Sequence, residues 1–254
     1  MISDRCCEFL SAEYGKRALR KFNKYKADLE DTIRFISARY RDLSPEYYLD
    51  IGAGDGTWTL EISRGIGARN IDFLEPSAEA CEEFKKKSCK DFMGHVSIFP
   101  QRFEDFQADR RYGFISAIHS WYYISPNELA KLYGLLEHGA KASIFMDSKS
   151  DVIKRIQNIC EKHLGEASNN LEDITGFLDK SGIRYDVLVG ERVNEKVDGL
   201  IHEGDFTDKT RNIISLVSWT RWRDVPKAAK DEVLDMLLTS DRASVRRYIE
   251  IVKK

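Results

Sequence analysis

Short apolar runs alternate with longer amphipathic segments along most of the chain. The apolar runs are typical of buried strands, and they occupy residues 47–51, 71–75, 95–99, 114–119, 142–146, 185–189 and 247–252. The segments between them carry apolar residues at helical spacing, and they occupy residues 57–64, 77–89, 127–136, 152–163 and 171–180. Because strands alternate with helices, the pattern predicts a parallel sheet built from β-α-β units.

Two regions depart from this alternation. Residues 8–40 place apolar side chains at roughly helical spacing among charges. Residues 191–240 hold Trp219 and Trp222, whose spacing of three predicts one shared helical face, with core packing favoured over a substrate wall. We therefore expect four parts: an N-terminal helical segment (1–45), an α/β core (46–190), a helical substrate cover (191–240) and a last strand that returns to the core (241–254).

Composition narrows the class of protein. The chain has 40 Lys and Arg against 42 Asp and Glu, so no excess of positive charge favours a nucleic-acid partner. No apolar run approaches the roughly 20 residues of a membrane span, and the polar N-terminus does not resemble a signal peptide. The five cysteines and the scattered histidines show no metal-ligand spacing, and the run Lys85-Lys86-Lys87 is interpreted as a solvated face. These features predict a cytoplasmic protein without a metal site.

A glycine-rich turn follows the first apolar strand. It reads Asp50-x-Gly52-x-Gly54-x-Gly56 and leads directly into a helical segment. Glycines let the backbone turn tightly and approach a ligand, and the following helix directs N–H groups at it. Glu75 ends the second strand, where an acidic side chain accepts hydrogen bonds from ribose hydroxyls. Together these features predict a β-α-β unit that binds a nucleoside.

The glycine spacing restricts which nucleoside is bound. Dinucleotide-binding turns read Gly-x-Gly-x-x-Gly, whereas this turn reads Gly-x-Gly-x-Gly, which disfavours a nicotinamide-dependent oxidoreductase. The chain has no Gly-Lys-Ser/Thr, so a P-loop for ATP is excluded.

The turn at 50–56 resembles the first motif of class I S-adenosylmethionine-dependent methyltransferases, and the resemblance covers residues 49–146. It implies a doubly wound, mostly parallel, seven-stranded Rossmann-like sheet whose last strand is antiparallel, with S-adenosyl-L-methionine as cofactor. It also implies cofactor contacts from the glycine turn and from the ends of strands two, three and four. These fall at Asp50, Gly52, Gly54, Asp55, Gly56, Glu75, Pro76, Ser77, Arg102, Phe103, Glu104 and Ile118.

Several segments are also similar to histamine N-methyltransferases, among them Glu75–Glu79, Phe114–Ile118 and Tyr122-Tyr123. The polar contacts of that enzyme to histamine are mostly not reproduced. His119 stands where a glutamine contacts the substrate, and Ser244 stands where an asparagine precedes the last strand. The resemblance therefore implies a related small molecule as the acceptor rather than histamine.

The end of the fourth strand faces the reacting methyl group in this family. His119 at that position is expected to accept a proton or to orient the nucleophile, since imidazole titrates near ~6.5; a core histidine is the alternative. Aromatic faces stabilise cations, but alternation along the backbone keeps Trp121, Tyr122 and Tyr123 from all facing one ligand. The expected catalytic residues are His119 and Tyr122, and the expected substrate contacts are Glu30, His119, Tyr122, Tyr123 and Trp219.

The expected activity is in-line methyl transfer to an amine or imidazole nitrogen of a small molecule, with S-adenosylhomocysteine as the product. The alternatives are O-methylation of a small metabolite and a non-catalytic cofactor-binding protein of the same fold. A nucleic-acid methyltransferase is disfavoured, because Ile118-His119-Ser120-Trp121 replaces the polar-Pro-Pro-aromatic loop of base-flipping enzymes. The sequence is compatible with a monomer or a homodimer.

Overall fold

The computed structural model describes residues 9, 27–193, 200–202, 204–239 and 244–254, and it divides the chain into two compact units. The first, here called the sheet unit, consists of residues 27–146, 171–190 and 247–254. The second, called the helical unit, consists of residues 1–26, 147–170 and 191–246. Residues 147–170 thus group with the helical unit, although the sequence pattern assigned them to the α/β core.

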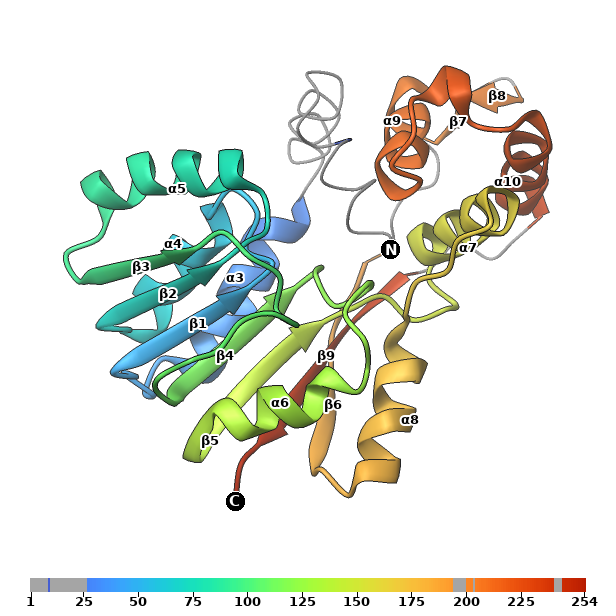
Figure 1. Ribbon diagram of the computed structural model, residues 1–254. Coiled ribbons are helices and arrows are strands. Elements are labelled where there is room, and N and C mark those ends of the chain that lie inside the picture. Colours follow the sequence, from blue (N-terminus) through green and yellow to red (C-terminus); the bar gives the residue numbers. More distant parts are fainter. Residues whose placement is uncertain (1–8, 10–26, 194–199, 203, 240–243) are drawn as a thin grey trace. The chain divides into compact units, whose positions relative to one another are not determined.

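The sheet unit is built on seven strands in the order β3-β2-β1-β4-β5-β9-β6 (Figure 1). Their bounds are Tyr47–Ile51 (β1), Asn70–Leu74 (β2), His95–Phe99 (β3), Tyr112–Ile118 (β4), Leu136–Phe145 (β5), Tyr185–Val193 (β6) and Ser244–Val252 (β9). Strands β1 to β5 pair in parallel, whereas β9 is antiparallel to β5. The predicted mostly parallel, seven-stranded sheet is confirmed, and the ligand-binding edge of such a sheet is formed by the carboxyl ends of its parallel strands.

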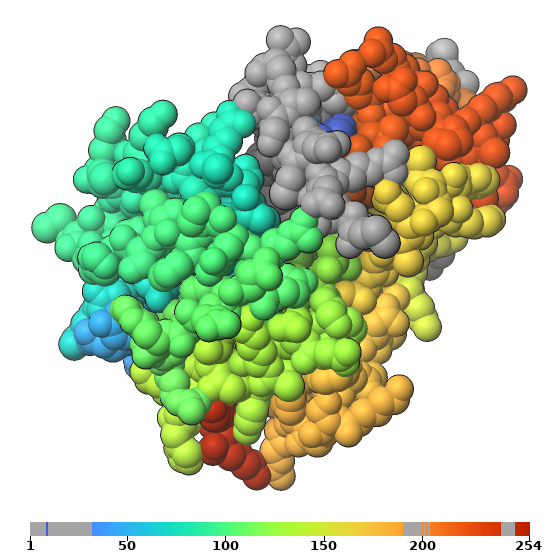
Figure 2. Space-filling model, in the orientation of Figure 1, coloured from blue at the N-terminus to red at the C-terminus, as the bar shows by residue number. Residues whose placement is uncertain are grey.

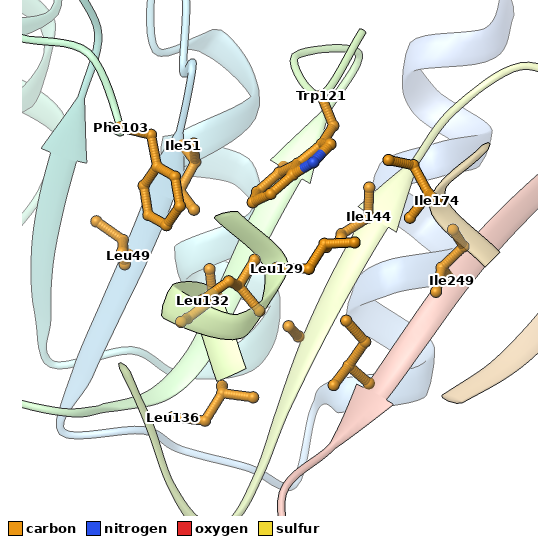
Figure 3. Packing of buried hydrophobic residues seen from close by; sticks show 14 of the residues in the cluster. Leu49, Ile51, Phe103, Trp121, Leu129, Leu132, Leu136, Ile144, Ile174 and Ile249 are labelled. Atoms are coloured by element: carbon orange, nitrogen blue, oxygen red, sulfur yellow. The ribbon is translucent and has the colours of Figure 1, made fainter. Parts of the chain in front are cut away.

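Helices cover both faces of this sheet. Apolar side chains of α3, α4 and α5 form one core with the sheet, and those of α6 and α8 form the other. The bounds are Ala27–Tyr40 (α3), Thr57–Ile66 (α4), Ala78–Asp91 (α5), Glu128–Leu135 (α6) and Leu171–Ser181 (α8). Figure 3 shows the second core, where Leu129 of α6 lies beside Ile144 of β5 and Leu132 lies on the other side of the helix. The central strands are apolar on both sides because both sides are covered, which explains why they appear as continuous apolar runs.

A charge pair joins α3 to the sheet across a long stretch of sequence. The guanidinium of Arg39 donates to both carboxylate oxygens of Glu250, at 3.2 and 2.9 Å, and the ammonium of Lys141 lies 3.6 Å from one of them. Glu250 is buried. Burial alone would raise the pKa of its carboxyl, but the hydrogen bond from Arg39 and the nearby charges bring that pKa below its usual value. The pair therefore keeps a buried carboxylate ionised.

Replacing Arg39 with methionine is expected to lower the free energy of unfolding by about 1–3 kcal/mol, since it leaves a buried carboxylate short of donors; part of the pair is exposed to solvent. Chemical denaturation followed by circular dichroism measures this change. The control is Arg41→Met, which removes an exposed arginine nearby. Equal stabilities of the two variants would show that the pair does not stabilise the docking of α3.

The helical unit contains α7 (Val152–Leu164), α9 (Asp208–Val217), α10 (Lys227–Thr239), a short 3-10 helix η2 (Trp222–Asp224) and a hairpin of β7 (Ile201–His202) and β8 (Asp205–Phe206). Apolar side chains of α7, α9 and α10 form its core. No helix among the residues that the structure describes is long and apolar enough to cross a membrane.

The two tryptophans of this unit do not share a helical face, so that prediction was wrong. Helix α9 ends at Val217, the backbone of Trp219 is left-handed with φ of +49°, and Trp222 begins η2. The Trp219 ring lies 6.1 Å from the Phe9 ring, and the Trp222 ring lies 5.2 Å from that of Phe206. Both side chains are half-buried and pack against aromatic partners within the helical unit, and the choice between core packing and a substrate wall stays a prediction.

Candidate functional site

The turn between β1 and α4 is left-handed at each of its three glycines, with φ of +65°, +59° and +73° at Gly52, Gly54 and Gly56. A Cβ atom at Gly52 would lie 2.4 Å from the Cβ of Ser120, and one at Gly56 would lie 2.0 Å from the ring of Phe84. At Gly54, by contrast, nothing lies within 4 Å. Packing therefore requires two of the glycines, while the third faces open space that a ligand can approach.

Glu75 anchors this turn from the end of β2. The N–H of Gly54 donates to one carboxylate oxygen at 3.0 Å, and the N–H of Ser77 donates to the other at 2.9 Å. Burial raises the pKa of Glu75 to about 7, against the effect of these two hydrogen bonds. A carboxylate oxygen accepts two hydrogen bonds, so each has capacity for one more donor. Glu75 can therefore accept hydrogen bonds from two hydroxyls placed over Gly54.

Asp50 lies beneath the turn, not at its surface. It is 2% exposed, and its two oxygens accept hydrogen bonds from the hydroxyls of Thr59 and Ser116, both at 2.6 Å. Tyr48 in turn bonds Ser116 at 2.7 Å. Burial raises the pKa of Asp50 to about 6. This network joins β1, β4 and α4 under the glycines, so Asp50 acts by positioning the turn.

The remaining residues expected at the cofactor differ in their surroundings. Ser77 caps α5, accepting a hydrogen bond from the N–H of Ala80 at 3.3 Å, and the preceding Pro76 is exposed. Phe103 is 3% exposed and lies 5.4 Å from the ring of Trp121, so it belongs to the core. The neighbours of Phe103 on either side reach the surface: Arg102 is half-buried and Glu104 is exposed.

His119 directly follows β4 and has a left-handed backbone with φ of +55°. Such a conformation is uncommon outside glycine and tends to occur at functional sites. The imidazole stands edge-on to the ring of Phe145 at 4.3 Å, and its Nδ1 lies 3.2 Å from the hydroxyl of Tyr122. The structure thus brings together the two residues expected to be catalytic. Ile118, which ends β4, is half-buried.

Trp58 is an aromatic neighbour that the sequence reasoning missed. Its ring lies 6.4 Å from that of His119, in an edge-on arrangement, and it belongs to the first turn of α4. A large aromatic residue two positions after the last glycine of the turn is the signal that could have found it. Of the three consecutive aromatic residues, Trp121 is fully buried and Tyr122 is 8% exposed, and both belong to the core, whereas Tyr123 is half-buried and packs against it.

The structure does not test two of the expected substrate contacts. Glu30 lies in α3, but its side chain falls outside the described part of the chain, as does that of Ser244 in β9. Trp219 belongs to the helical unit. The roles of Glu30 and Trp219 in binding an acceptor stay predictions.

Known proteins identify the family. A sequence model of the family described as "Methyltransferase domain" matches residues 18–179, well over half of the chain. This match agrees with the strand order and with the glycine turn and Glu75 at the carboxyl edge of the sheet. The chain is a class I S-adenosylmethionine-dependent methyltransferase. Its cofactor is S-adenosyl-L-methionine, as predicted.

Solved structures share the fold of this methyltransferase at low sequence identity. The YcgJ protein of Bacillus subtilis has 10% identity and a TM-score of 0.61, over 87% of this chain and 97% of that one. The plantazolicin methyltransferase BpumL in complex with SAH has 12% identity and a TM-score of 0.58, over 98% and 94%. The N-methyltransferase NodS of Bradyrhizobium japonicum has 10% identity and a TM-score of 0.52, over 92% and 97%. No curated protein matches the sequence, and the similarity to histamine N-methyltransferase stays a prediction.

The residues present in the methyltransferase fit its cofactor. No heavy atom lies within 4 Å of the Cβ position at Gly54, so a ligand can approach the backbone there, and the two oxygens of Glu75 suit the two ribose hydroxyls. His119 lies next to this turn, because the side chain of Ser120 packs against Gly52 and its hydroxyl donates to the carbonyl of Ile51 at 2.6 Å.

Proposed function

We propose that this methyltransferase acts on an amine or imidazole nitrogen of a small molecule, with His119 beside the nitrogen and Glu75 holding the ribose of the cofactor. The observation that carries the proposal is the arrangement of aromatic rings around His119, next to the glycine turn. Trp58, Tyr122 and Phe145 surround the imidazole. Aromatic faces stabilise a cation, and both a protonated amine and a sulfonium are cations.

The bound cofactor supplies a methyl group on a positively charged sulfur, which is already a good leaving group. The protein therefore contributes mainly proximity and alignment. A nitrogen attacks through its lone pair, so it must be unprotonated when it does so. His119 serves this need as a proton acceptor or as a hydrogen-bond partner that orients the nitrogen.

The contact with Tyr122 bears on which ring nitrogen of His119 faces the acceptor. When Nδ1–H donates to the hydroxyl of Tyr122, Nε2 of the neutral imidazole carries the lone pair that takes a proton. The reverse direction of this hydrogen bond makes Nε2 a donor instead. The direction of this hydrogen bond thus decides whether Nε2 of His119 accepts or donates a proton at the acceptor.

The direct test is transfer of labelled methyl from S-adenosylmethionine to a panel of small amines, imidazoles, alcohols and thiols. The proposal expects label in the nitrogen compounds. Label in hydroxyl compounds alone would replace it with O-methylation. Tight binding of S-adenosylhomocysteine, with no methyl transfer to any compound of the panel, would favour a non-catalytic cofactor-binding protein.

The affinity for S-adenosylhomocysteine is expected to rise with pH. Burial raises the pKa of Glu75 to about 7, so at lower pH its carboxyl is largely protonated and loses an acceptor site. Binding favours the ionised form and should strengthen by up to about tenfold between pH 6 and 8, then level off. Calorimetric titration at several pH values measures the trend. In Glu75→Gln the same interval should show a flat affinity, and an unchanged pH dependence would assign it to another group.

A further inference from the structure

We propose that Lys87 is a positioning residue for the cofactor, because its ammonium group holds the glycine turn in the conformation that opens Gly54 to the ligand. The inference rests on the role of this turn in binding S-adenosylmethionine. Lys87 belongs to the run Lys85-Lys86-Lys87, whose charges predict a solvated face. The structure gives it a different environment from its neighbours.

All three N–H groups of Lys87 have acceptors in the turn. Its ammonium donates to the carbonyl of Asp55 at 3.0 Å, to the carboxylate of Asp55 at 2.9 Å and to the hydroxyl of Thr57 at 3.2 Å. The other carboxylate oxygen of Asp55 accepts the N–H of Thr57 at 3.1 Å. An ammonium has three donors, so these contacts use its full capacity. The Lys87 side chain therefore holds both the backbone and the side chains of the segment from Asp55 to Thr57.

Helix α5 presents two adjacent side chains to this turn. Phe84 and Lys87 are three residues apart and so lie on one face of the helix. Phe84 fills the position where Gly56 lacks a side chain, and Lys87 binds the residues on either side of that glycine. Lys85 and Lys86 are exposed, and Figure 2 shows part of α5 at the surface of the sheet unit.

The ion pair keeps Asp55 charged. Burial works to raise the pKa of its carboxyl, but the hydrogen bond and charge of Lys87, with the N–H of Thr57, bring that pKa below its usual value. The pair is about one-third exposed on each side, at 37% for Lys87 and 32% for Asp55, so its effect on global stability is modest. Its effect is local, because a turn already held in one conformation has less freedom to lose when the cofactor binds.

The test compares Lys87→Met with Lys86→Met, which removes an equivalent charge from the exposed face of the same helix. Titration calorimetry measures the affinity of each for S-adenosylhomocysteine and for S-adenosylmethionine. We expect Lys87→Met to weaken both by about 5- to 30-fold and Lys86→Met to match the unaltered protein. Lys87→Arg, which keeps a cation with several donors, should recover part of the loss.

A second variant distinguishes an effect on the turn from an effect on the stability of the whole fold. Asp55→Asn removes the ion pair but keeps the backbone carbonyl, and it should weaken both ligands without lowering the midpoint of thermal unfolding. Combined with Lys87→Met, it should weaken binding by less than the product of the two single effects, since both act on one interaction.

Equal affinities for Lys87→Met and Lys86→Met would overturn the inference. A loss with only one of the two ligands would also overturn it, because a positioned turn acts on the adenosyl group that both ligands share. Failure of the unaltered protein to bind S-adenosylhomocysteine is a distinct outcome, since it would refute the cofactor site itself.

Discussion

Replacing His119 with asparagine is expected to lower kcat for methyl transfer by about 10²- to 10⁴-fold, the usual contribution of a positioned acid or base. Asparagine tolerates the left-handed backbone that His119 adopts, so this variant removes the imidazole with little added strain. The affinity for S-adenosylhomocysteine should stay nearly unchanged, because Glu75 and the glycine turn bind that ligand. Steady-state kinetics with an acceptor found in the labelling panel, together with calorimetry, measure both quantities.

Tyr122→Phe is the matched control for the His119 variant. It keeps the ring and removes only the hydroxyl that lies 3.2 Å from Nδ1. Its kcat should fall less than that of His119→Asn, and its pH profile should shift, since the imidazole loses its hydrogen bond at Nδ1. A His119 variant that loses cofactor affinity but keeps its turnover would remove His119 from the acceptor pocket.

Replacing Glu75 with alanine is expected to weaken binding of S-adenosylhomocysteine by roughly 10- to 150-fold, which corresponds to the roughly 1.5–3 kcal/mol of hydrogen bonds to a charged group. The variant removes an acceptor for the ribose and also the anchor of the Gly54 N–H. Glu82→Ala, which removes an exposed carboxylate from α5, is the control and should bind as before.

An analogue of S-adenosylhomocysteine without the ribose 2′-hydroxyl separates the two roles of Glu75. If Glu75 accepts that hydroxyl, the analogue should lose much affinity for the unaltered protein and little for Glu75→Ala. The same loss in both proteins would leave Glu75 as an anchor of the turn only, and the ribose contact would have to be assigned elsewhere.

Much of the sheet unit could be predicted because its local patterns are unambiguous. Strands buried on both faces are continuous apolar runs, and glycines that must be left-handed stand together between one of these runs and a helix. Glu75 and His119 were found in the same way, as polar residues directly after apolar strands. In each case the position in the chain fixes the position at the carboxyl edge of the sheet.

Other features depend on contacts between distant segments, and these leave no local signal. Lys87 looks like its exposed neighbours until α5 is placed against the glycine turn. Arg39 and Glu250 meet although 211 positions separate them. Trp219 and Trp222 have helical spacing, but α9 ends before them, at Val217. No glycine or proline follows Val217 to mark that end in the sequence. The three-residue spacing was therefore misleading.

The strand order has a consequence for how the sheet is completed during synthesis. Strand β9 comes last in the chain, yet it lies between β5 and β6. Its neighbour β6 ends at Val193, and β9 begins only at Ser244. The segment between them must therefore be translated before β9 can join β6. During that interval β5 is an open edge flanked by apolar side chains, the kind of surface that chaperones protect and that aggregates when left uncovered. Because β9 lies between β5 and β6 in the finished sheet, its insertion covers both edges at once.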